Sequence, residues 1–167
     1  MKKGDIWISA VLYIGIGIVI LVVILSASMP LIRKARDENV ISQTRQVMLE
    51  LDDNIRTVIG EGAGSQRVFS VEIGRGELFI NDLNNSISWS LETNAEVAEA
   101  GSVVHFGNLD LLNLKQAEGF LVTLSLSYNN TADIINVENK IKGRSDLVIF
   151  NNESMPGKLP KIKISSK

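Results

Sequence analysis

The sequence predicts an α+β protein in which a long amino-terminal helix precedes an antiparallel β-sheet or β-sandwich. Three observations support this prediction. Residues 6–32 contain no charged side chain. Residues 33–60 repeat apolar side chains at spacings of three, four and seven, which is the period of an amphipathic helix. From residue 66, short runs of alternating apolar and polar residues are separated by polar turns, which is typical of antiparallel strands.

The chain therefore divides into four segments. They are a basic segment (1–4), an apolar helix (5–32), an amphipathic continuation of that helix (33–60) and a β-rich head (66–167).

The apolar run is long enough to cross a membrane as a helix. A helix rises about 1.5 Å per residue and the hydrocarbon core is about 30 Å thick, so roughly 20 apolar residues suffice. The run is rich in Ile and Val, which favour strands in water. In lipid, however, every backbone polar group must bond within its own segment, so a lone segment becomes a helix. Trp7 and Tyr13 lie near one end, where aromatic side chains favour the headgroup boundary.

Three residues within the run bear on helix packing. Gly15 and Gly17 allow another helix to approach closely. Pro30 removes one backbone donor, which predicts a kink or a loosened turn. The basic residues that follow at 33–36 suit a headgroup surface, but the charges on the two sides of the run do not fix its orientation.

Two other interpretations of the run remain open. A secretory signal peptide would begin with Lys2 and Lys3 and would be cleaved after Ser28, within a run of small residues. Its apolar core would be longer than the usual stretch of about 7–15 residues. A permanent single-pass anchor fits the length equally well. A buried helix of a soluble protein is disfavoured by the length of the run.

The second half of the helix has one apolar face and needs a partner surface. We expect one helix from about Asp5 to Ile59, ended by the glycine-rich segment 60–64, which we interpret as a flexible hinge. Arg45, Glu50 and Asp53 should face outward. The apolar face comprises Val40, Ile41, Thr44, Val47, Met48, Leu51, Ile55, Val58 and Ile59. Its expected partner is the inner face of the sheet, formed by Phe69, Val71, Ile87, Trp89, Val122, Leu124 and Leu126.

The head should contain several short strands. Glycine and polar residues predict turns at 74–76 and 143–146, and Thr93 with Glu96 has the spacing of a capping box for a short helical turn over 93–100. The expected strands are 68–73, 77–80, 86–91, 103–106, 120–128, 135–141, 147–150 and a Lys-flanked edge strand at 162–164.

The sequence offers no recognisable catalytic, cofactor or metal site. There is no cysteine, and the single histidine, His105, has no placed companion and reads as a structural residue. The glycines at 60–64 follow a helix, whereas a phosphate-binding loop follows a strand. Asp52, Asp53 and Asp82 do not match the spacing of a calcium loop, so we interpret them as solvated acids.

The acidic charge of residues 37–157 argues against nucleic acid as a partner, although the tail 158–167 holds four lysines and no acid. Residues 37–157 contain eight Lys and Arg residues against 18 Asp and Glu residues. A nucleic-acid-binding surface needs a basic face.

Three sequons predict possible N-glycosylation. They begin at Asn84, Asn129 and Asn152, all at expected strand ends or turns where a glycan would fit. Their shared placement favours an extracytoplasmic sheet domain.

The first 60 residues resemble archaeal type IV pilins and their archaellin relatives. The matching features are Lys2-Lys3-Gly4 directly before an apolar run, the Ile- and Gly-rich stretch 13–18, the single Pro30 and the amphipathic continuation to Ile59. A β-rich head after such a helix agrees with that family. The fifth residue counted from Asp5 is Ser9, where many pilins have a glutamate.

The resemblance implies a function and a set of partners. A prepilin peptidase would cleave between Gly4 and Asp5, and the chain would wait in the membrane as a single-pass protein with its head outside. It would then join copies of itself, through an assembly platform and ATPase, in an adhesive surface filament as a major or minor subunit. Lys2 and Lys3 would oppose burial in an apolar filament core, which gives a reason to remove them first.

Two further classes of function stay open. A permanent single-pass anchor could carry a β-sandwich that binds a ligand or another surface protein. An enzyme would need a polar cleft with several convergent titratable groups.

Overall fold

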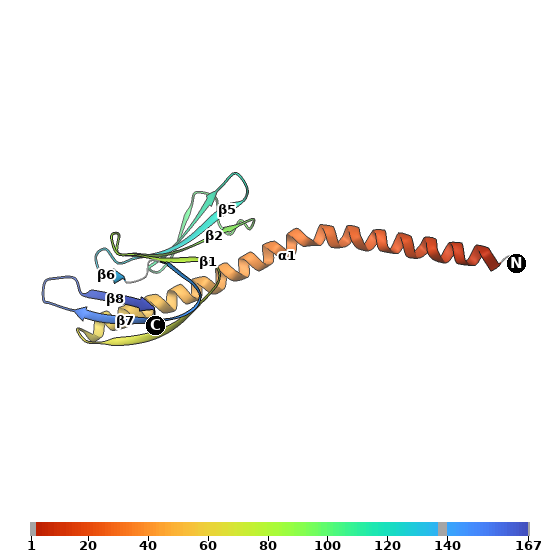
Figure 1. The fold of residues 1–167 in the computed structure, drawn as a ribbon. Helices are drawn as coiled ribbons and strands as arrows, with labels where there is room; N and C mark the ends of the chain where they lie inside the picture. The colour runs from red at the N-terminus through yellow and green to blue at the C-terminus, as the bar shows by residue number, and fades with distance from the viewer. Residues whose placement is uncertain (1–2, 137–139, 167) are drawn as a thin grey trace. The chain divides into compact units, whose positions relative to one another are not determined.

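The computed structural model describes residues 3–136 and 140–166. One long helix, α1 (Lys3–Glu61), precedes a sheet of eight strands, so the predicted α+β fold is confirmed (Figure 1). The strands are β1 (Gln66–Asn81), β2 (Ser86–Thr93), β3 (Val103–Phe106), β4 (Leu109–Lys115), β5 (Phe120–Ser127), β6 (Asp133–Asn136), β7 (Lys140–Glu153) and β8 (Lys161–Ser166).

The chain forms two compact units, Met1–Arg36 and Asp37–Lys167. Helix α1 is continuous in its hydrogen-bonded structure from one unit into the next, through Pro30. The second unit thus contains the amphipathic part of α1 together with all the strands, because that part of the helix forms one side of the core. We call residues 37–167 the head, which begins earlier than the predicted boundary at residue 66.

The sheet has the strand order β3-β4-β5-β2-β1-β7-β8-β6. All neighbouring strands are antiparallel except β6 and β8, which are parallel. The edges are therefore β3 and β6. The prediction that residues 162–164 form an edge strand is wrong, because β6 pairs with β8 on its outer side. The flanking lysines are compatible with a strand whose outer face meets solvent.

The two predicted turns at 74–76 and 143–146 are also wrong. Both segments lie within long strands, β1 and β7, that pair with each other along most of their length. The glycines mark an irregularity instead, because the pairing register shifts between Ile73 and Leu78. Gly76 has a φ of 78°, and a Cβ there would lie 2.4 Å from the carbonyl oxygen of Ser90. Only glycine fits this bulge.

Other parts of the predicted strand pattern need correction. Residues 93–100 are not helical, because the Thr93 hydroxyl accepts a hydrogen bond from the Ala95 amide at 2.9 Å and so closes a local turn. Strand β4 escaped prediction because buried Asn113 interrupts its inward apolar row. The expected strand 135–141 is two strands, with Ile135 in β6 and Ile141 in β7. Val137 and Asn139 lie outside the described residues.

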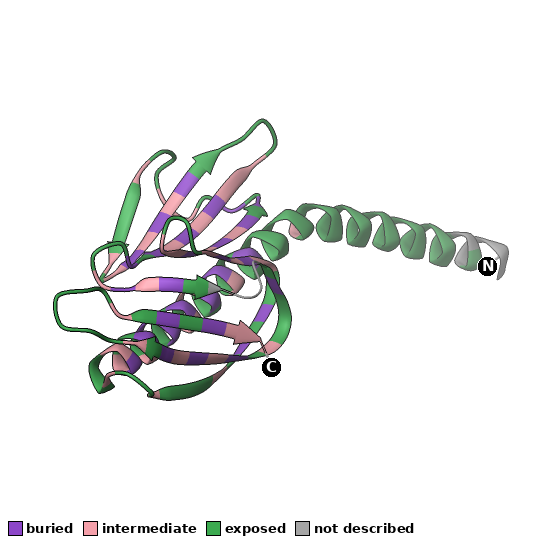
Figure 2. Ribbon diagram, turned by 60° about the vertical axis from the view of Figure 1, so that its left-hand side comes forward, coloured by how far each residue is buried: buried purple, intermediate pink, exposed green. Residues whose placement is uncertain are grey.

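The core of the head lies between α1 and the sheet. Met48, Leu51 and Ile55 of α1 are completely buried, and Trp89 and Tyr128 are the largest buried side chains. Along the strands, buried positions alternate with more exposed ones (Figure 2). The predicted helix–sheet core is confirmed, with Val40, Val47, Ile59 and Phe69 only partly buried at its border.

Candidate functional site

The first part of α1 is an exposed apolar surface. Of the described residues, this helix alone is long and apolar enough to cross a membrane, and its most apolar window has no residue buried within the protein. The large apolar side chains described between Trp7 and Ile32 are 49–76% exposed. An exposed apolar surface of this size is typical of a site of contact with a membrane or with another protein. The helix thus fits a single-pass membrane anchor.

The predicted packing residues lie on this surface. Leu12, Gly15, Ile16 and Val19 line an open apolar depression, and no atom lies within 4 Å of the place where a Cβ on Gly15 or Gly17 would stand. Pro30 lies inside the helix. The depression has room for a neighbouring helix, as expected for glycine positions on a membrane helix.

The positions of both predicted cleavage sites are helical. Gly4 and Asp5 lie in the first turn of α1. The hydroxyls of Ser26 and Ser28 donate to the carbonyl oxygens of Val22 and Ile24, each at 2.8 Å. These serines satisfy their polar groups within the helix, so they add no unpaired donor to an apolar environment.

Asp37 fastens the beginning of the head. Its carboxylate is buried (5% exposed), accepts a hydrogen bond from the Thr93 hydroxyl at 2.6 Å and forms an ion pair with Arg75. Arg75 lies in the bulge of β1, where its carbonyl oxygen accepts a hydrogen bond from the indole of Trp89 at 2.9 Å. The bulge that replaces the predicted turn therefore places a cation against the helix.

Asp52 forms a second buried polar contact. Its carboxylate accepts hydrogen bonds from Tyr128 at 2.8 Å, from Asn108 at 3.1 Å and from Arg56 at 2.9 Å. The prediction that Asp52 is a solvated acid is wrong, because Tyr128 and Asn108 cover it from the sheet side. Burial, and then the charge of Asp52, raise the pKa of Tyr128 well above its ordinary value. Tyr128 therefore stays a neutral donor.

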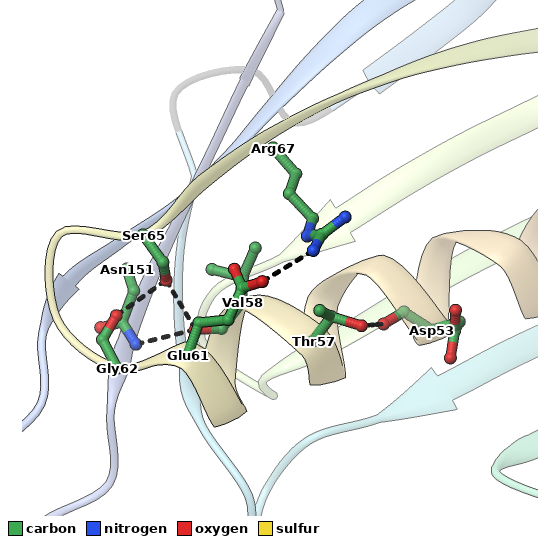
Figure 3. A network of polar contacts seen from close by, with 8 residues as sticks. All are labelled: Asp53, Thr57, Val58, Glu61, Gly62, Ser65, Arg67 and Asn151. Atoms are coloured by element: carbon green, nitrogen blue, oxygen red, sulfur yellow. Dashed lines mark hydrogen bonds and ion pairs between the residues drawn. The ribbon is translucent and has the colours of Figure 1, made fainter.

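The carboxyl end of α1 is tied to strand β7 (Figure 3). The Ser65 hydroxyl and the Asn151 amide both donate to the carbonyl oxygen of Val58, at 2.8 and 3.2 Å. The Gly64 amide donates to the carbonyl oxygen of Asn151 at 2.8 Å. Gly62 and Gly64 have positive φ, as a helix end with a sharp exit requires. The segment 60–64 is an anchored cap, which corrects the expectation of a flexible hinge.

The outer side of the helix matches the prediction for two residues of three. Glu50 and Asp53 are exposed. Arg45 is half-buried, and its guanidinium lies 4.7 Å from the centre of the Phe106 ring. The sequence did not predict this contact, because apolar periodicity does not show that the edge strand β3 packs beside this part of the helix.

His105 lies on the edge strand β3 with an exposed side chain. Its Nδ1 is 2.6 Å from a carboxylate oxygen of Asp110, its cross-strand neighbour in β4. The sequence pattern did not reveal this partner because it did not reveal β4. Within residues 3–136 and 140–166, no three His, Asp or Glu side chains come together in a way that could hold a metal ion.

All three asparagines of the sequons are exposed. Asn84 lies in the turn between β1 and β2, and Asn129 in the turn after β5. Asn152 lies within β7, where the pairing with β8 skips from Asn151 to Glu153, so it occupies a bulge rather than a strand end. Within a single chain, glycans would meet no packed surface at these positions.

Exposed ion pairs join neighbouring strands on the outer face. Glu77 of β1 lies between Lys140 and Lys142 of β7. The hydrogen bond from Lys140, and to a smaller degree that from Lys142, holds the pKa of Glu77 below its usual range. Lys161 likewise lowers the pKa of Glu153, at 2.6 Å. Both sets of ion pairs lie on the surface, and Glu153 and Lys161 line an open pocket of about 220 Å³ together with Asp133 and Lys158.

Comparison of the chain with protein-family models, curated proteins and solved structures gives no match.

Proposed function

We propose that this chain is the structural subunit of a surface filament of the type IV pilus kind, held in the membrane by its helix before assembly. The observation that supports this most is the division of labour along α1. Its first part presents apolar side chains on all sides, and its second part is built into a complete head.

An apolar surface on every side suits two environments in turn. Lipid surrounds such a helix without a polar partner, and a bundle of identical helices offers similar apolar contacts. Transfer from lipid to a filament core then costs little, since the environment remains apolar. The open depression at Gly15 supports close packing of helices in such a core.

A filament subunit also needs a head that keeps its structure outside the membrane without disulfides. The chain has no cysteine. Polar contacts at Asp37, Asp52 and Val58 fasten the sheet along the helix at three levels. Because the sheet is bonded to the helix at these three positions, the packing of helices in a filament core would also determine where each sheet lies on the filament surface.

The test uses cells that produce the full chain. We expect surface filaments in electron micrographs, and a subunit mass that lacks Met1–Gly4. An intact start with no filaments would favour the second candidate, a permanent single-pass anchor with a binding head, which the exposed apolar helix also supports. Cleavage after Ser28 would favour a secreted protein.

The orientation has its own test. Ser127 is exposed at the end of β5, and the chain has no other cysteine to react. We expect Ser127→Cys to be labelled on intact cells by a thiol reagent that does not cross membranes. Labelling only after lysis would contradict an external head.

A further inference from the structure

The head has a groove, lined by both apolar and polar side chains, that its own chain leaves open. The groove has a volume of about 270 Å³ and lies between α1 and the edge formed by β3 and β4. Its lining includes the apolar side chains of Ile41, Val97, Phe106 and Leu111 and the polar side chains of Ser42 and Arg45. A cavity of roughly 150 Å³ holds a benzene molecule, so the groove has room for a large apolar side chain.

The same head carries an exposed apolar side chain of the required size. Leu83 is 90% exposed, the highest value among the large apolar residues that the structure describes. It lies in the β1–β2 turn between Asp82 and Asn84, which are also exposed. The turn is held by hydrogen bonds from the Asn84 amide to Asn81 Oδ1 at 3.2 Å and from the Asn85 amide to the Asp82 carbonyl at 3.4 Å. Leu83 is thus presented on an ordered tip.

Leu83 cannot reach the groove of its own chain. Strands β5 and β4 separate β2 from β3 in the sheet. Neighbouring strands lie about 4.8 Å apart, so roughly 14 Å of sheet separates β2 from the edge strand that lines the groove. A second molecule has to supply the side chain.

We propose that the Asp82–Asn84 tip of one copy docks in the groove of the next copy, with Leu83 among the apolar side chains and Asp82 facing Arg45. Charge complementarity supports this pairing, because Arg45 is half-exposed at the groove and Asp82 adjoins the leucine. Glu38 also lines the groove and would repel Asp82, which places the tip on the Arg45 side.

The contact joins two different surfaces, so every copy can both donate a tip and accept one. Such a heterologous contact continues from copy to copy unless the rotation closes a ring. A tip of three residues is much smaller than a stable interface of about 800 Å² per partner. The tip contact therefore does not hold copies together by itself. Packing of the helices brings the copies close together, which gives the tip a high effective concentration at the groove, and the contact then fixes the register between the copies. The inference rests on the proposed filament and names its contact between heads.

Cross-linking in the full chain tests the contact, since the chain has no cysteine of its own. Leu83→Cys combined with Ser42→Cys should give a ladder of dimers, trimers and larger species when producing cells are oxidised. Each single variant should give no ladder, and cells that produce both single variants should give dimers only. Leu83→Cys with Val97→Cys is a second pair, in case the first disturbs the helix.

Charge reversal sharpens the test. In the double-cysteine background, Asp82→Arg or Arg45→Asp alone should reduce the ladder several-fold, and the two together should restore it. Asp53→Arg, at an exposed acid outside the groove lining, is the matched control and should leave the ladder unchanged.

The outcomes separate the docking from the filament. If filaments form and the cysteines react with a maleimide, but neither pair gives a ladder, the docking is wrong and the filament stands. If no filament forms, the proposed function fails, and a ladder in the membrane fraction would still support docking between copies. A ladder that ignores both charge reversals would overturn the Asp82–Arg45 contact.

Discussion

The two halves of α1 have the same secondary structure but opposite surroundings. The large apolar side chains that the structure describes between Trp7 and Ile32 are exposed, whereas Met48, Leu51 and Ile55 are completely buried. The first half has apolar residues on every side, and the second half has them on one side only. The contrast teaches that the partner of the second half is the chain itself, while the partner of the first half lies outside the chain.

Polar side chains in the two halves differ in the same way. In the first half, Ser26 and Ser28 bond only to the backbone of their own helix. In the second half, Asp37 bonds to Thr93 of β2 and Asp52 to Tyr128, directly after β5, which are 56 and 76 positions away along the chain. The first half thus satisfies these polar groups within its own helix, as an apolar environment requires, whereas the second half bonds to distant parts of the chain.

The largest expected effect comes from a charge placed on the buried side of the second half. Leu51→Asp in a soluble fragment of residues 37–167 should lower the free energy of unfolding by about 4 kcal/mol or more, because it buries an unpaired carboxylate and removes core contacts. Asp53→Ala, two residues on and exposed, should change it by less than about 0.5 kcal/mol. Chemical denaturation measures both. Equal effects would mean that the helix stands free of the sheet.

The corresponding change in the first half should leave the head intact. In the full chain, Ile20→Asp should weaken membrane insertion by about 3 kcal/mol, since a charge at the centre of a spanning helix is costly. Thermal unfolding of the head in detergent should stay unchanged. A head destabilised by Ile20→Asp would contradict the separation of the two halves.

A smaller loss is expected where the sheet bends to meet the second half. Gly76→Ala should destabilise the fragment by about 2–3 kcal/mol, because the new methyl group would meet the Ser90 carbonyl and the Trp89 indole at positive φ. Gly74, in the same bulge, has open space around its Cβ position and no positive φ. Gly74→Ala is therefore the matched control, with a change within about 0.5 kcal/mol. A similar cost for both would locate the constraint elsewhere.

The periodicity of the sequence was enough to predict the helix, most strands and the helix–sheet core. Apolar spacing reports which residues share a face, so the spacing alone assigns Leu51 and Trp89 to facing surfaces. The long-range pairing of strands was not predictable in this way. Glycines at 74–76 favour a turn and a bulge equally, and only the continuous pairing of β1 with β7 decides between them.

The polar contacts of the candidate site were the least predictable part. Asp52 and Arg56 have the spacing of an ion pair on a helix, which could have been noticed. The burial of Asp52 depends on Tyr128 and Asn108, which come from distant parts of the chain. Asn113 is buried with its side-chain amide bonded to the Ala98 carbonyl at 2.6 Å. A polar residue at an inward position breaks the apolar pattern, so the strand that contains it was missed.

The smallest effect in this series concerns the hydroxyl of Tyr128. Tyr128→Phe should lower the free energy of unfolding of the fragment by about 1–2 kcal/mol at neutral pH, because Asp52 loses one of its three hydrogen-bond donors while remaining buried. Urea denaturation measures the change. The double variant Tyr128→Phe/Asp52→Asn should lose less free energy of unfolding than the two single variants lose in sum, since the two residues act as a unit.

The pH dependence gives a sharper test of the same contact. Burial and the neighbouring Asp52 raise the pKa of Tyr128 in the folded state, whereas an unfolded tyrosine titrates at about pH 10. Below that pH both states keep the proton. Above it the unfolded state loses the proton first, so stability falls as pH rises. Lys142 and Lys161, whose pKa values are raised by Glu77 and Glu153, add a decline of the same sign. Tyr128→Phe removes only the tyrosine part, so its stability should fall less steeply above about pH 10 than that of the parent fragment.

Tyr128 is the only tyrosine in residues 37–167, so the absorbance of tyrosinate can be followed without interference. If the tyrosinate absorbance appears at about pH 10 while the fragment is still folded, the hydroxyl of Tyr128 is not held by Asp52.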